Sequence, residues 1–176
     1  MPASNLDLGP CIVVWDADGT PVIFDKTNGG VFFRYEELQT PIKEDQAGET
    51  DVDDVTTGAV NPTLEVPLTR DEVTDLVNVF SNASASVGGS NLKVANPVGQ
   101  AVFASSKHVI AKPIINGIVS VDPEEWVHIY KAYPRVAMEQ AYDNSGQRVI
   151  VATFKGYPST ISGTIGALWR FGDAAP

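Results

Sequence analysis

Residues 35–80 read YEELQTPIKEDQAGETDVDDVTTGAVNPTLEVPLTRDEVTDLVNVF. The first part of this stretch, from Glu36 to Asn61, is polar and contains two glycines, Gly48 and Gly58. Its acidic centre consists of Glu44, Asp45, Glu49, Asp51, Asp53 and Asp54. Because these 26 residues show no apolar periodicity, we expect a long acidic loop over residues 36–61. Loops of this length in a compact domain are usually functional or disordered.

A strand and a helix are expected after this loop. The short apolar run from Pro62 to Leu68 predicts a strand. A helix is predicted over residues 70–80, opened by a capping box in which Thr69 and Glu72 each bond the other's amide. One apolar stripe at helical spacing is expected to pack on the rest of the domain: Val73, Leu76, Val77 and Phe80.

The rest of the chain alternates short apolar runs with turn signals. Asp18-Gly19 separates the runs 11–15 and 21–24, and Asn116-Gly117 follows a third run, so each predicts a β-hairpin. About ten short strands with this spacing indicate an antiparallel β-sandwich or an open barrel. The predicted fold class is α+β with β dominant: one domain over residues 1–176, with one flanking α-helix and the long acidic loop.

Composition excludes several classes of protein. The chain has 176 residues, of which 43% are hydrophobic and 19% charged, as in ordinary globular domains. Its one cysteine, Cys11, excludes an internal disulfide and a cysteine-based zinc site, and its place in an apolar run predicts burial. No apolar run approaches the roughly 20 residues of a membrane span, and the first seven residues lack the features of a signal peptide. We therefore expect synthesis in the cytoplasm and no membrane partner.

The net charge of −10 is unevenly distributed. Residues 1–75 hold 16 acids and 4 bases, whereas residues 76–176 hold 6 acids and 8 bases. The acidic first half argues against a DNA-binding surface, which needs clustered Lys and Arg. A solvated acidic loop is one interpretation of this charge. The other is a surface past which DNA moves without sticking, because like charges repel.

Residues 12–20, IVVWDADGT, resemble the first motif of the haloacid-dehalogenase phosphatases. The resemblance implies a nucleophile at Asp16, a general acid/base at Asp18 and a bound Mg²⁺. The rest of the chain departs from that family, because residues 21–24 indicate a return strand and only one helix is predicted where a parallel α/β sheet needs several. The only Gly-Asp pair, Gly172-Asp173, lies near the end of the chain. An Asp-Gly hairpin turn is the preferred interpretation, and no catalytic residue is assigned.

Two histidines are candidates for a metal site. His108 and His128 have Glu124 and Glu125 within reach in sequence, but they lack a ligand spacing such as His-x-x-x-His. We therefore expect half-exposed histidines with a structural role. The acids of residues 44–54 lack the spacing of a calcium-binding loop, so neither a metal nor a cofactor is expected.

Residues 46–58, QAGETDVDDVTTG, and the segment Leu64–Phe80 resemble the tail tube (major tail) protein of long-tailed bacteriophages. The resemblance implies a structural virion protein that forms hexameric rings, which stack into a tube and conduct viral DNA without binding it specifically. It also implies contacts with other tail proteins, and a loop that packs against neighbouring subunits. Within the loop, we expect the β-branched residues Val52, Val55 and Val60 to dock. The residues assigned to this inter-subunit loop are Glu44, Asp45, Gly48, Asp51, Val52, Asp53, Asp54, Val55, Gly58 and Val60.

Three alternatives stay open at this point. The chain could belong to another ring-forming component, such as a tail terminator or the tube of a contractile or secretion machine. The phosphatase is a second alternative. In the third, the loop is disordered and has no partner.

Overall fold

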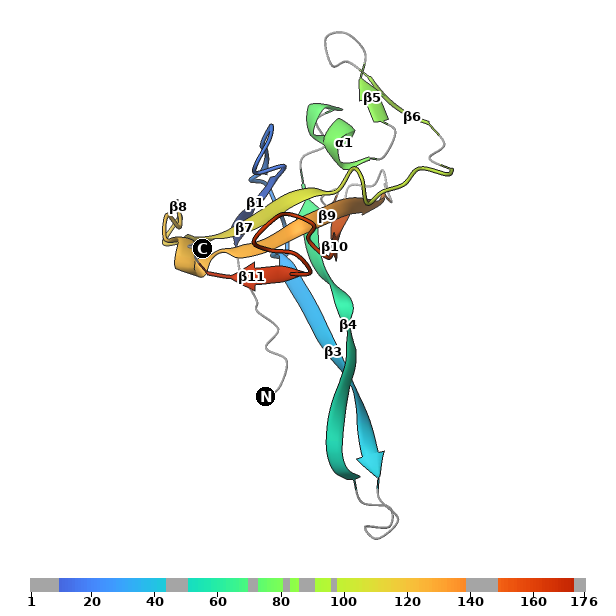
Figure 1. Cartoon of the computed structure of the whole chain (residues 1–176). Coiled ribbons are helices and arrows are strands. Elements are labelled where there is room, and N and C mark those ends of the chain that lie inside the picture. Colours follow the sequence, from blue (N-terminus) through green and yellow to red (C-terminus); the bar gives the residue numbers. More distant parts are fainter. Residues whose placement is uncertain are drawn as a thin grey trace.

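The computed structural model describes residues 10–43, 51–69, 73–80, 83–85, 91–95, 98–138 and 149–172, with the backbone alone at residues 51–52 and 73–75. Strands dominate it (Figure 1). They are β1 (Cys11–Trp15), β2 (Val22–Phe24), β3 (Phe32–Lys43), β4 (Asp51–Leu68), β5 (Ala83–Ala85), β6 (Leu92–Val94), β7 (Lys107–Ile115), β8 (Ile118–Val119), β9 (Val127–Ala137), β10 (Ile150–Tyr157) and β11 (Trp169–Phe171). The described helices are α1 (Val73–Val79) and a 3-10 helix, η2 (Pro123–Glu125).

One antiparallel sheet of nine strands contains most of these elements. Its path runs β2-β1-β7-β9-β10-β4-β3, with β11 paired to β9 and β8 paired to β7. β11 pairs with the first part of β9 and β10 pairs with the rest. β5 and β6 form a separate two-stranded sheet. The prediction of an antiparallel, β-dominant fold is confirmed, and over the described residues the sheet does not close into a barrel.

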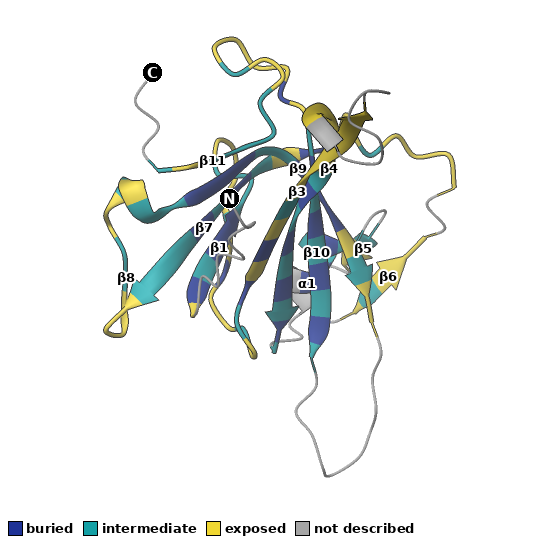
Figure 2. Cartoon of the chain, turned by 90° about the horizontal axis from the view of Figure 1, so that it is seen from below, coloured by how far each residue is buried: buried dark blue, intermediate teal, exposed yellow. Residues whose placement is uncertain are grey.

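The core lies on one face of this sheet. β4 buries every second residue from Pro62 to Leu68, and β10 buries every second residue from Ile150 to Gly156. Phe154 lies opposite Leu64, so the two sets of buried side chains point to the same side. This alternation is what an antiparallel strand with one covered face requires. Figure 2 shows the contrast between these buried positions and the exposed outer part of β3.

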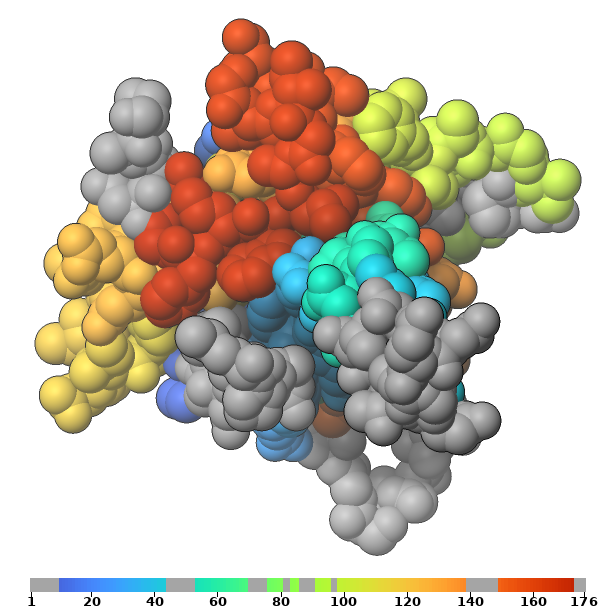
Figure 3. Space-filling model, turned by 60° about the horizontal axis from the view of Figure 1, so that its bottom comes forward, coloured from blue at the N-terminus to red at the C-terminus, as the bar shows by residue number. Residues whose placement is uncertain are grey.

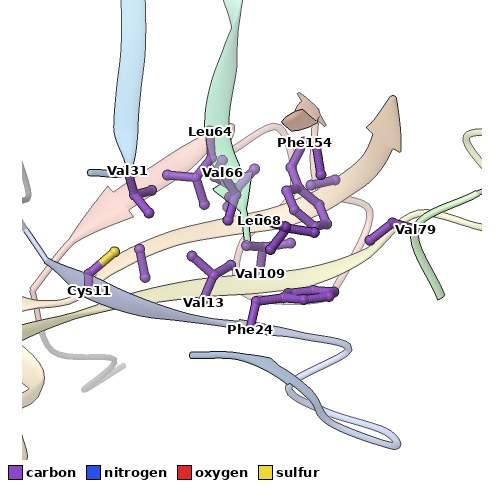
Figure 4. Packing of buried hydrophobic residues seen from close by; sticks show 14 of the residues in the cluster. Cys11, Val13, Phe24, Val31, Leu64, Val66, Leu68, Val79, Val109 and Phe154 are labelled. Atoms are coloured by element: carbon purple, nitrogen blue, oxygen red, sulfur yellow. The ribbon is translucent and has the colours of Figure 1, made fainter. Parts of the chain in front are cut away.

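The sheet curves so that distant strands meet in the core. Phe154 of β10 packs against Trp15 of β1 and Phe24 of β2, at ring-centroid distances of 6.3 and 6.0 Å. Phe33 of β3 lies 4.9 Å from Trp169 of β11. Aromatic pairs of this kind contribute about 0.5–1.5 kcal/mol beyond the area they bury. The hydrophobic cluster is therefore assembled from both ends of the chain (Figure 4).

Gly156 in β10 is required by a close approach between strands. A side chain at this position would place its Cβ 2.6 Å from Pro62 Cγ and 2.8 Å from Ile129 Cγ2. Asn61 Nδ2 donates a hydrogen bond to the Gly156 carbonyl at 2.6 Å, which fixes the same crossing. Glycine therefore provides space here, and β10 continues through Tyr157.

Both predicted hairpin turns are confirmed. β1 and β2 pair across a turn in which the Gly19 amide donates to the Asp16 carbonyl at 3.0 Å. Asp16 itself has a φ of 57°, and its carboxylate accepts from the Thr20 amide at 3.3 Å. Asn116 and Gly117, with φ of 51° and 79°, connect β7 to β8. Asn and Gly tolerate this left-handed region, which explains why the sequence signal was reliable.

The predicted long loop over residues 36–61 is wrong. β3 reaches Lys43 and β4 begins at Asp51, so most of these residues pair as a β-hairpin, and residues 44–50 lie outside the described part. Apolar residues recur at regular spacing only where one face of a strand or helix is buried. Almost every described side chain of this hairpin is exposed, on both of its faces. Main-chain pairing and strand-favouring Thr and Val are sufficient to form the strands without that periodicity.

The predicted helix is confirmed over Val73–Val79, but its buried face differs from the expected stripe. Leu76 and Val79 are buried in the core and Phe80 packs against it, whereas Val77 is only half-buried. The side chain of Val73 is outside the described part. The face of α1 that packs on the core is therefore Leu76, Val79 and Phe80, at i, i+3 and i+4, which has the same helical spacing as the expected stripe.

The predicted capping box at the start of the helix lies partly outside the described residues, and only Thr69 is described. The Thr69 amide donates to the Lys26 carbonyl at 3.1 Å, so it is already bonded. The Thr69 hydroxyl also donates to this carbonyl, at 3.3 Å. Glu72 lies outside the described residues. The end of β4 is therefore tied to the segment after β2, a tertiary contact that the local motif does not predict.

Candidate assembly surface

β3 and β4 extend beyond the rest of the sheet as a two-stranded arm, defined here as residues 36–43 and 51–61 (Figure 1). The cross-strand pairs run from Glu36 opposite Val60 to Lys43 opposite Asp51. Nearly all described side chains of the arm are exposed. Figure 3 brings this side of the molecule forward, and the cyan and teal residues of the arm lie in front of the body. The arm is therefore a large surface that the described part of its own chain does not cover.

The arm has one apolar face. Partners in an antiparallel pair point to the same side, and Leu38 and Ile42 share a side because they are four residues apart on β3. Thr40 lies opposite Val55 and Glu36 lies opposite Val60, so both valines join that side. The exposed fractions of the four apolar side chains are Leu38 45%, Ile42 39%, Val55 47% and Val60 45%.

A β-bulge in β4 makes this arrangement. Val55 and Val60 are five residues apart, which places them on opposite faces of a regular strand. The register shifts between Leu38 and Gln39, which lie opposite Gly58 and Thr56, so β4 carries one extra residue there. Such a bulge re-aims the side chains that follow it. It brings the two valines onto the face of Leu38 and Ile42.

The structure places the predicted inter-subunit residues as follows. The described side chains, all exposed, are Asp53, Asp54 and Val55, with Gly58 and Val60 further along β4. Asp51 and Val52 lie in β4 with only their backbone described. Glu44, Asp45 and Gly48 lie outside the described residues. Leu38 and Ile42 were missed, because sequence reasoning treated them as loop, although their four-residue separation fits a strand.

The arm is acidic as well as apolar. Its described acids with placed side chains are Glu36, Glu37, Asp53 and Asp54, and none of them forms an ion pair with a described residue. At the base of the arm Arg34 pairs with Glu65 at 2.6 Å. Burial, followed by the nearby Glu37 carboxylate, raises the pKa of Tyr35. Unpaired acids attract basic partners, and this attraction is largest at low salt.

Asp16 and Asp18, the candidates for catalysis, lie in the turn that connects β1 to β2. Asp16 accepts from Lys107 Nζ at 3.2 Å. Asp18 Oδ2 lies 3.0 Å from His108 Nδ1, and His108 Nε2 lies 3.3 Å from His128 Nδ1. Because a carboxylate only accepts, His108 donates to Asp18 and accepts from His128. Asp16 occupies a turn between antiparallel strands, which differs from the parallel α/β sheet that the phosphatase resemblance implies.

The prediction of half-exposed histidines is wrong for His128. The residue is 4% exposed, because β9 is an interior strand, the His108 ring stacks on the imidazole and the Trp126 ring lies tilted beside it. Burial, followed by the charges of Arg170, His108 and Lys112, lowers the pKa of His128 to about 4. Glu125 accepts from the Ser120 hydroxyl and Glu124 is exposed. Among the described residues no group of three or more His, Cys, Asp and Glu side chains could hold a metal ion.

Comparison with known proteins leaves the family undetermined. Neither a scan against protein-family models nor a search of curated proteins found a match for this chain. In the described part of the chain, no helix is long and apolar enough to cross a membrane. The features that point to a function are the resemblance carried by residues 46–58 and 64–80 and the exposed apolar face of the arm.

Proposed function

We propose that this chain is a tail tube protein of a long-tailed bacteriophage. Its subunits form hexameric rings, and the rings stack into the tube through which viral DNA is ejected. The curved sheet, with Phe33 and Trp169 in contact across it, serves as the sandwich that the resemblance implies. The observation that carries the proposal is the arm, which is apolar on one face and is left uncovered by the other described residues of its own chain.

The energetics of the arm favour a partner. A two-stranded hairpin alone is marginally stable in water. Each of the four apolar side chains of the arm is about half exposed, so covering it contributes roughly 1 kcal/mol, half of the value for complete burial. Contact with a second subunit supplies this energy and also removes a free sheet edge. The arm projects from one side of the body, and where it meets a different surface of the second subunit the contact is head to tail and supports rings or stacks.

Negative-stain electron microscopy of the purified, concentrated protein tests this function. Hollow tubes of uniform diameter, with six subunits around the axis, are the expected result. Isolated rings without tubes would favour a terminator-like component. Protein that remains monomeric at all concentrations would contradict the proposal.

A shortened arm makes the test specific. Gln39 and Thr56 are cross-strand partners, so residues 40–55 can be replaced by an Asn-Gly turn that preserves the register at the base. We expect a folded subunit that no longer forms tubes. The matched control is Val121→Asp, which adds a charge at an 88%-exposed apolar residue outside the arm and should leave tubes intact. Normal tubes from the shortened chain would show that the arm has no role in stacking.

A further inference from the structure

The body of the protein contains a hollow of about 440 Å³ beside the end of α1. Its walls come from the end of α1, the segment before β7, and the neighbouring strands β9 and β10. The lining residues that matter here are Phe80, Val102, Tyr133, Arg135, Lys155 and Tyr157. The lining is thus apolar and aromatic with two cations, and it contains no acid among the described residues.

The two cations of the hollow stand on one face of the sheet. Lys155 lies opposite Tyr133, and Arg135 lies two residues further along β9, so both point away from the core face. Neither of them forms an ion pair with a described residue. Lys155 Nζ lies 5.9 Å from the ring centre of Tyr157, an aromatic contact that leaves its charge available.

The arm and the hollow are complementary. The arm offers an apolar face flanked by Asp53, with Asp54 beside it, and its residues 36–43 and 51–61 contain five acids and one base. The hollow offers apolar walls with Arg135 and Lys155. In Figure 1 the arm points away from the side of the body where α1 lies, so the arm of one chain does not fill its own hollow.

From this complementarity we infer that the acidic arm of one subunit docks into the basic hollow beside α1 of a second copy of this chain. The inference rests on the proposed function, because it names the surface that receives the arm when subunits stack. The contact is head to tail, since donor and acceptor lie on opposite sides of the body, and a head-to-tail contact that does not close into a ring repeats along a tube.

Charge exchange tests this contact. The hollow variant Arg135→Glu/Lys155→Glu and the arm variant Asp53→Lys/Asp54→Lys should each lose at least about tenfold in association, measured by sedimentation velocity. Mixing the two variants should restore association, because each then meets an opposite charge on the other. The control Lys26→Glu/Lys93→Glu changes the net charge as the hollow variant does, at two exposed residues that do not line the hollow, and should behave as wild type.

Cross-linking with a carbodiimide locates the contact. Joining of Asp53 or Asp54 to Lys155 in assembled wild-type protein is expected, and mass spectrometry identifies it. Unchanged association of the hollow variant, or failure of the mixture to recover, would overturn the inference. DNA binding by wild type that the hollow variant loses while its assembly is intact would assign the cations to nucleic acid instead.

The two proposals fail separately. Tubes whose cross-links avoid Lys155 would support the tail tube function and contradict this docking site. Dimers or short oligomers that contain the cross-link, without tubes, would support the docking site and contradict the tube. A chain that shows neither association nor the cross-link contradicts both.

Discussion

Acidification is expected to destabilise this protein through His128. The imidazole is buried, its Nε2 has no hydrogen-bond partner in the described structure, and its Nδ1 faces His108. Protonation would place a charge on that buried nitrogen near the positive charges of Arg170 of β11 and Lys112 of β7, which outweigh the favourable carboxylate of Asp18. The unfolded chain carries no such penalty, so it binds the proton more readily.

The size of the effect follows from the two pKa values. The pKa of His128 is about 4 in the folded protein, against an ordinary value of 6.5. The stability supplied by neutral His128 is therefore complete above about pH 6.5, falls as the pH decreases, and is lost below about pH 4. The difference corresponds to about 3 kcal/mol in total, of which about 2 kcal/mol is lost by about pH 5.

Urea unfolding followed by tryptophan fluorescence between about pH 7 and pH 4 measures this loss, and the chain supplies three tryptophans as probes. The control is His128→Gln, which keeps a side-chain donor and acceptor but does not titrate. Carboxylates contribute equally to both proteins, so the difference between their pH profiles isolates the histidine. Parallel profiles over this range would refute the assignment of a buried neutral imidazole.

Three further predictions concern the core. Leu76→Ala should lower the free energy of unfolding by about 2–5 kcal/mol, and Val77→Ala should lower it clearly less, because only Leu76 is buried. Equal losses in urea titrations would mean that α1 packs on another face. Gly156→Ala should lower the free energy of unfolding by about 1–3 kcal/mol, because the new Cβ would lie 2.6 and 2.8 Å from neighbouring atoms. Gly58 has open space around it, so thermal melts of Gly58→Ala should not show this steric cost. Burial raises the pKa of Cys11 to about 12, so a thiol reagent should label it only after unfolding, and rapid labelling of the native protein would contradict this.

Several features of the fold could be predicted from the properties of individual residues and their neighbours in sequence. Asn116 and Gly117 set one hairpin because both accept the positive φ of its turn, and in the β1–β2 turn the residue with positive φ is Asp16. The burial of Cys11 and the position of α1 followed from apolar runs and helical spacing. Strand-rich composition between turn signals was sufficient for the antiparallel, β-dominant class.

The candidate surfaces depended on register and packing, which sequence patterns do not encode. The arm looked like a loop because neither of its faces is buried, and periodicity exists only where burial selects it. One extra residue in β4 decided that Val55 and Val60 share a face with Leu38. The burial of His128 came from strands that flank β9 on both sides. The sequence alone determined where the chain turns and which segments are apolar, because both follow from the conformational preferences and solubility of individual residues. Only the tertiary structure decided which side chains stand together, because strand pairing joins residues far apart in the chain.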